Sequence, residues 1–186
     1  RFFRCNGVHG RVTVEEAIAK SCNTFFYTIG AQLDVDLING WAAELGLGVL
    51  TGIDLPNESR GLVPSHSWKF NSYGESWYPG ESVSVAIGQG PVAVTPISLA
   101  VAISTVANGG FRITPRLVKA LGGSDGRLKS VAGPRPVRVS LGPETRDALK
   151  QGLWHAVNGD GTGRNASLVG RDVLLSLIHI SEPTRR

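Results

Sequence analysis

Residues 17–30 read AIAKSCNTFFYTIG, an apolar run with a helical pattern that Ser21 and Asn23 interrupt. In an unbroken helix, residues two positions apart point about 200° apart around the axis, so these side chains could not serve one ligand. Serine and asparagine compete for backbone hydrogen bonds and favour helix ends. The spacing alone favours a pair of capping residues, and a catalytic turn requires the helix to break here.

Caps and apolar periodicity predict several helices outward from this run. Thr13 and Glu16 have the spacing of a capping box. Thr95 precedes Pro96 at a second helix start, and the residues that follow are apolar nearly all round, so this helix should be buried. If the helix breaks near Ser21, a new helix can begin at Thr24. Four further helices are expected over residues 14–21, 37–45, 96–107 and 143–157, and Asp36 is the expected N-cap of the second.

Strand signals are shorter and mixed with the helices. Val83, Val85 and Ile87 alternate with small residues in ESVSVAIGQG, which predicts a strand over residues 81–90. Residues 111–121 and 127–131 predict two strands around an Asp125-Gly126 turn. The stretch 51–77 is rich in Pro, Gly, Ser and Asn and predicts a long loop. Without a regular strand–helix alternation, the expected class is α+β with antiparallel strands.

Composition excludes several classes of protein. The chain has 186 residues, 41% hydrophobic and 18% charged, which is typical of a globular domain. Its formal charge of +4 comes from 19 basic and 15 acidic residues without a basic run between aromatics, so we expect no nucleic-acid partner. No apolar stretch reaches 18 residues. Because the chain contains no methionine, we expect it to be part of a longer protein.

Two cysteines, Cys5 and Cys22, are too few for a disulfide scaffold. A single bridge between them in an oxidising compartment would contribute roughly 3 kcal/mol. Two small buried thiols are an equally good interpretation. With His9 they offer three zinc-type ligands where a structural site needs four, so we expect no metal site.

The last residues differ from the rest of the chain. LSLIHISEPTRR, from Leu175, is an apolar run with a polar end, and it resembles the translated end of a transposon-based sequencing adapter. We therefore expect a domain over residues 1–173 and a non-native, adapter-like tail over residues 174–186. The tail is left out of the prediction of fold and function, His179 included.

Other motifs are weak. GDGTGRN has no Gly-Lys-Ser/Thr ending and GQGPVAVTP lacks a third glycine, so both predict turns and not phosphate sites. His9, His66 and His155 have no spacing typical of a metal site or a serine–histidine pair. Three aromatic residues could form either an exposed patch or part of the core; they are Trp68, Trp77 and Tyr78.

Taken together, four stretches resemble the transpeptidase domain of class B penicillin-binding proteins. They are HGRVTVEEAIAKSCNTFFYTIG, ELGLGVLTGIDLPNESRGLVP, WYPGESVSVAIGQGPVAVTPISLAVAISTVANGGF and GTGRNA, in that order. The resemblance covers residues 1–173, and Trp77 to Gly80 followed by Ile87 to Gly90 is more similar to the elongation type (penicillin-binding protein 2) than to the division type. It implies a partial penicillin-binding-protein/β-lactamase-like fold, in which an antiparallel sheet is flanked by helices.

The resemblance also assigns a site. Ser21-Cys22-Asn23 matches the family's Ser-x-Asn/Asp motif, on a loop between two helices. It implies that Ser21 relays protons with the lysine that activates the nucleophile, and that Asn23 holds the amide backbone of the substrate. Neither Ser-x-x-Lys nor Lys-Thr/Ser-Gly occurs in the chain, so we expect both outside it and residues 1–186 to be inactive by themselves.

The implied function is a serine D,D-transpeptidase that cross-links peptidoglycan stem peptides and binds β-lactams, without a cofactor. The resemblance places it on the periplasmic side of the bacterial inner membrane, anchored by an N-terminal helix outside these residues and working with a membrane-embedded cell-wall synthase. Two alternatives keep the fold: a division-type transpeptidase, and a non-catalytic β-lactam sensor or scaffold. A β-lactamase would need a deacylating base, and none of the carboxylates is identifiable as one.

Overall fold

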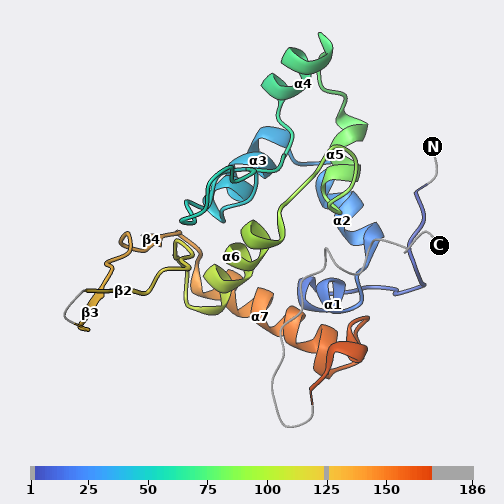
Figure 1. Ribbon diagram of the computed structural model, residues 1–186. Helices are drawn as coiled ribbons and strands as arrows, with labels where there is room; N and C mark the ends of the chain where they lie inside the picture. The colour runs from blue at the N-terminus through green and yellow to red at the C-terminus, as the bar shows by residue number, and fades with distance from the viewer. Residues whose placement is uncertain (1–2, 124–125, 169–186) are drawn as a thin grey trace. The chain divides into compact units, whose positions relative to one another are not determined.

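The computed structural model describes residues 3–123 and 126–168. Helices dominate them (Figure 1). Within this part, the chain divides into two compact units, each described by itself: residues 3–38, 64–92 and 141–168 form the first, and residues 39–63, 93–123 and 126–140 form the second. The predicted tail, 174–186, lies outside the described residues.

The first unit is built from helices. Its elements are α1 (Val14–Ala19), α2 (Asn23–Gly30), the first turn of α3 (Val35–Glu44), α4 (His66–Tyr73), α5 (Pro79–Val85), α7 (Pro143–Asn158) and the 3-10 helix η1 (Arg164–Ala166). The short helix α1 packs against α7, and α2 packs against α5 (Figure 1). These two contacts hold both ends of the turn between α1 and α2.

Several of these helices begin at a residue whose side chain caps the first turn. The Glu16 amide donates to Thr13 Oγ1 over 3.3 Å and the Thr13 amide donates to Glu16 Oε2 over 3.0 Å, so the predicted capping box is confirmed. Helix α3 begins two residues before the predicted start. Asp34, and not Asp36, accepts from the first turn, with 2.8 Å between its Oδ1 and the Asp36 amide.

The apolar core of the first unit centres on Val35, Trp77 and Val85. Trp68 packs against this cluster from α4, and the indole of Trp77 donates to Ser82 Oγ over 3.0 Å. Tyr78 is exposed. The three aromatic residues therefore divide between core and surface.

The second unit contains the rest of α3, α6 (Pro96–Ala107) and four short strands. Strand β1 (Phe111–Arg112) pairs with β4 (Val137–Arg138), and β2 (Ala120–Gly122) pairs with β3 (Leu128–Ser130), both antiparallel. The cap of Thr95 on the Ser98 amide is as predicted. The predicted burial of α6 is confirmed for one side of the helix only, because Ala100, Ser104 and Ala107 are exposed. The predicted hairpin is confirmed where β2 pairs with β3, and its predicted turn residue Asp125 lies outside the described residues. The predicted first strand over 111–121 is wrong as one strand, because its start is β1, which pairs with β4.

Two predictions about residues 51–90 are wrong. Residues 79–85 form helix α5 and not a strand, because Pro79 occupies its first position and Glu81 accepts the Tyr78 amide over 2.9 Å. The predicted loop contains helix α4, which Ser65 caps through the Trp68 amide at 3.0 Å and Gly74 ends in the left-handed region, at a φ of 70°. Both helices are set by cap residues.

The α+β class is confirmed, with two antiparallel strand pairs and an isolated antiparallel bridge between Leu62 and Ala93 in the described residues. In that same part of the chain, no helix is both long and apolar enough to cross a bilayer.

Candidate active site

The chain breaks between α1 and α2 at Ser21. Helix α1 ends at Ala19, Ser21 has a φ of 50°, and α2 begins at Asn23. A positive φ is uncommon for serine and is sustained where the surrounding structure determines it. Here the Ser21 amide donates to Ile18 O over 3.2 Å and the Cys22 amide donates to Ala17 O over 2.9 Å. The predicted helix break is confirmed.

The break changes where the two predicted site residues point. Because the helical repeat stops at Ser21, its side chain and that of Asn23 are no longer held about 200° apart. Both are half-buried, and the Cys22 side chain between them is buried. Ser21 Oγ lies 2.9 Å from Thr162 Oγ1, on the loop that follows α7. Thr162 was not among the predicted site residues. The only feature of the sequence that could have indicated it is the Gly-Thr-Gly within GDGTGRN.

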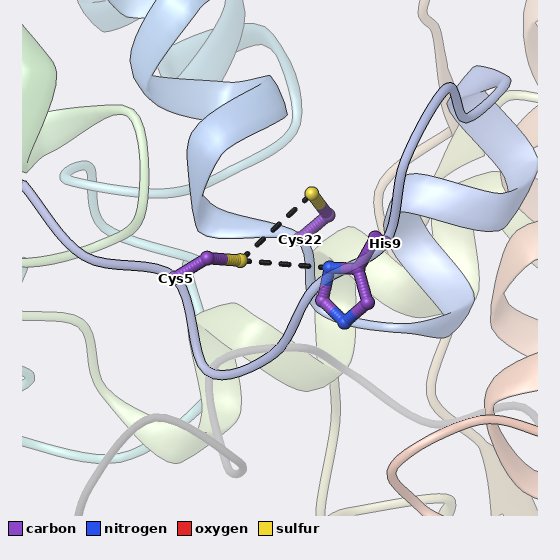
Figure 2. A group of neighbouring side chains, drawn as sticks. All are labelled: Cys5, His9 and Cys22. Atoms are coloured by element: carbon purple, nitrogen blue, oxygen red, sulfur yellow. Dashed lines mark hydrogen bonds between the residues drawn. The ribbon is translucent and has the colours of Figure 1, made fainter.

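Three soft or borderline ligands converge beside this turn (Figure 2). Cys5 Sγ lies 3.9 Å from Cys22 Sγ and 3.5 Å from His9 Nδ1. A disulfide requires about 2.05 Å between sulfurs, so both cysteines are free thiols in this structure.

The ligand atoms of these three residues all lie within 4.8 Å of one another, a set that could hold a thiophilic cation such as Zn²⁺ if a fourth ligand completed it. Spacing along the sequence did not show that they converge. The expectation of no metal site, which rested on the count of three ligands, stays a prediction.

The Cys5 side chain lies against the first residues of α2, where the Thr24 backbone hydrogen-bonds to it. Burial disfavours its thiolate, but hydrogen bonds from the backbone of Thr24 and Gly7, the Thr24 hydroxyl and the Cys22 thiol outweigh burial and lower the Cys5 pKa from 9.0 to about 6. The first amides of a helix stabilise a nearby anion in this way. At neutral pH, Cys5 is therefore expected to be a thiolate.

Alkylation should report this ionisation. With a chelator present to remove competing cations, the rate of iodoacetamide labelling at Cys5 is expected to reach half its plateau near pH 6, because the thiolate is the nucleophile. Peptide mass mapping against Cys5→Ser assigns the label, and the buried Cys22 should react more slowly. A half-plateau near pH 9 would contradict the assigned environment.

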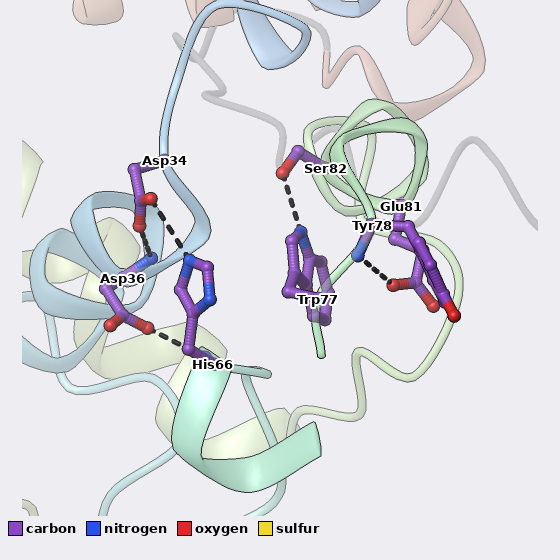
Figure 3. A network of polar contacts seen from close by, with 7 residues as sticks. All are labelled: Asp34, Asp36, His66, Trp77, Tyr78, Glu81 and Ser82. Atoms are coloured by element: carbon purple, nitrogen blue, oxygen red, sulfur yellow. Dashed lines mark hydrogen bonds and ion pairs between the residues drawn. The ribbon is translucent and has the colours of Figure 1, made fainter. Parts of the chain in front are cut away.

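A polar network fixes the segment that leads into α5 (Figure 3). Glu81, which accepts the Tyr78 amide, also accepts from the buried Lys69 Nζ at 2.6 and 2.7 Å. Burial opposes the charge on Lys69, but the Glu81 carboxylate outweighs burial and raises the Lys69 pKa above its ordinary value. This ion pair ties α4 to α5, and α5 in turn packs on α2.

The exposed cluster of Asp34, Asp36 and His66 in Figure 3 has a structural role. Asp36 Oδ1 accepts the His66 amide at the start of α4 over 2.9 Å, and Asp34 Oδ2 lies 3.1 Å from His66 Nε2. Both carboxylates are therefore engaged at helix starts, so this cluster does not contribute to the candidate site.

The chain belongs to the penicillin binding protein transpeptidase domain family, whose model matches residues 4–173. Proteins named peptidoglycan D,D-transpeptidase MrdA and solved PBP2 structures are among its matches, as the resemblance to penicillin-binding protein 2 predicted. Peptidoglycan D,D-transpeptidase MrdA of Acinetobacter baumannii is 41% identical over 116 residues, which are 62% of this chain and 17% of that protein.

Solved structures of penicillin-binding proteins are similar to this chain in fold. PBP2 of Pseudomonas aeruginosa in complex with WCK 5153 is 32% identical, with a TM-score of 0.74 over 84% of this chain and 35% of that chain. PBP2 of Helicobacter pylori in its complex with MreC is 27% identical, with a TM-score of 0.68 over 82% of this chain and 27% of that chain. The predicted fold is confirmed, and the chain spans well under half of each relative.

Proposed function

We propose that this chain is part of a peptidoglycan D,D-transpeptidase that works through a serine acyl-enzyme. The observation that carries the proposal is the turn at Ser21, where the Ser-x-Asn pattern falls on a break between two helices. The family membership and the D,D-transpeptidase name of the A. baumannii relative support it. The nucleophilic serine, its lysine and the Lys-Thr/Ser-Gly strand are proposed to lie outside residues 1–186.

The proposed roles follow from the chemistry of acyl transfer. When the nucleophilic serine attacks the peptide carbonyl, a C–O bond forms, the C–N bond breaks, and the proton of the serine must reach the leaving amine. The Ser21 hydroxyl can both accept and donate, so it can carry that proton between lysine and amine. The Asn23 amide can hold the substrate backbone in line for the attack.

Substrate, inhibitors and partners are assigned by the same reasoning. The acyl donor is a stem peptide of peptidoglycan, and a β-lactam would acylate the same serine. The H. pylori relative forms a complex with MreC, which supports a cell-wall synthesis partner of that kind here. The proposed location is the periplasmic side of the inner membrane, since the stem peptides are cross-linked there.

A labelled penicillin tests the proposal. The full-length protein that carries this sequence is expected to acquire a covalent label that survives denaturation, while the 186-residue chain acquires none. An excess of unlabelled β-lactam should block labelling. A full-length protein that binds penicillin reversibly without a covalent adduct would instead support the sensor or scaffold alternative.

A further inference from the structure

Thr162 contacts the Ser21 turn through both its side chain and its backbone. Its hydroxyl lies 2.9 Å from Ser21 Oγ, and its amide donates to Ala19 O over 3.1 Å. Ala19 is the last residue of α1, so Thr162 bridges the end of the helix and the turn that follows. We propose that Thr162 is a positioning residue that orients the Ser21 hydroxyl, an inference that rests on the function proposed above.

The loop that carries Thr162 is fixed by the end of α7. The amides of Gly159 and Gly161 donate to His155 O over 3.0 and 3.2 Å, and the Gly163 amide donates to Ala156 O over 2.8 Å. A Cβ on Gly161 would lie 2.2 Å from Ala156 Cα, so the loop lies against the helix with no space for a side chain. Thr162 is therefore held in place by α7, independently of Ser21.

A partner that is held in place can fix the position of the Ser21 side chain. Ser21 has a positive φ, a conformation that persists only where its surroundings determine it. Either hydroxyl of the pair can be the donor. When Thr162 donates, the Ser21 proton is free to move on, and when Thr162 accepts, the Ser21 lone pairs can take a proton. The contact thus fixes the position of Ser21 Oγ without fixing the direction of proton transfer.

The two contacts of Thr162 can be separated by substitution. Thr162→Val has nearly the same shape and keeps the amide that donates to Ala19, so it removes only the hydroxyl. Thr162→Ser keeps both contacts. Thr28→Val is the matched control, because Thr28 is exposed on α2 and its hydroxyl donates only within that helix, to Thr24 O.

The measurement is the rate constant of covalent labelling by penicillin in the full-length protein, resolved into binding and acylation. Thr162→Val is expected to slow acylation about three- to tenfold, the effect of one neutral hydrogen bond, with little change in binding. Thr162→Ser and Thr28→Val should match the wild type. In a Ser21→Ala background, Thr162→Val should have no further effect, because the group it orients is gone.

Each outcome is informative. If Thr162→Val equals Thr28→Val while Ser21→Ala is slow, the inference about Thr162 is wrong and the proposed function stands. A loss that persists undiminished in the Ser21→Ala background would reduce Thr162 to a structural tie between α1 and the loop. If the wild type is not acylated, the proposed function itself fails. If the wild type is acylated and Ser21→Ala is as fast, the proposed role of Ser21 is wrong, and that of Thr162 with it.

Discussion

Replacing Ser21 by alanine in the full-length protein is expected to slow acylation by penicillin by about 10²-fold or more, the usual contribution of a positioned proton-transfer group. The substitution removes the one hydroxyl at the break between α1 and α2, and no neighbouring contact replaces it in the described structure. Thr162 Oγ1, which lies 2.9 Å from Ser21 Oγ, is held by the α7 loop and cannot move into its place.

The time course of covalent labelling measures this effect. Ser72→Ala is the matched control, since Ser72 is an exposed residue of α4. The far-ultraviolet circular dichroism of Ser21→Ala should match the wild type, because the amides of Ser21 and Cys22 still close the turn onto α1. A Ser21→Ala protein that is labelled as fast as Ser72→Ala would show that this motif has no part in acyl transfer.

Cap chemistry is local, and for that reason much of the helical structure could be predicted from sequence. The side chains of Thr13, Glu16 and Thr95 lie within one turn of the amides that donate to them, and Pro96 has no amide that needs a partner. A few adjacent residues therefore decide each start. The strand prediction over 81–90 failed because an alternation over so few residues does not distinguish a strand from a short helix that is buried over a wide face, as α5 is at Ser82, Val83 and Val85. There the cap residues Pro79 and Glu81 were the better guide.

In helix α4, prediction from the sequence fails for a different reason. Three of its residues are buried or exposed against what hydrophobicity predicts: Lys69 is buried, whereas Phe70 and Tyr73 are exposed. Lys69 is tolerated inside because Glu81, twelve residues later, neutralises it at 2.6 Å. A pairing of that kind comes from tertiary structure, so no window of residues around α4 contains it.

The residues of the candidate site also divide into those that could be predicted from the sequence and those that could not. Ser21 and Asn23 were found through resemblance to a family, since a Ser-x-Asn triplet alone is weak, and their roles stay a prediction. Thr162 lies 141 residues from Ser21 and reaches it only because α1 packs on α7. Spacing could not have predicted that contact.

The packing of α1 on α7 depends on Gly152, and replacing it by alanine is the second large effect that we expect. Leu153, Ala156 and Val157 are buried on α7 beside it, and Ile18 is buried on α1. A Cβ on Gly152 would lie 2.7 Å from Ile18 Cβ and 3.1 Å from Glu15 O. Neither atom is the end of a flexible side chain, so α1 must move away from α7.

Gly152→Ala is therefore expected to destabilise the full-length protein by about 1–2 kcal/mol: overpacking costs about 1–3 kcal/mol, and the better helix propensity of alanine returns up to about 1 kcal/mol. Gly40→Ala, in α3, is the matched control, because a Cβ there meets nothing within 4 Å. That change should stabilise by about 0.5–1 kcal/mol. The urea midpoints of both variants, at an unchanged slope, measure the difference.

Acylation gives a second measure of Gly152→Ala. Moving α1 away from α7 separates Ala19 and Ser21 from Thr162, so the variant should be labelled more slowly even under conditions where it is fully folded. Gly40→Ala should be labelled like the wild type. If Gly152→Ala instead raises the urea midpoint as Gly40→Ala does, α1 does not pack against α7 as described, and the contact between Thr162 and Ser21 loses its support as well.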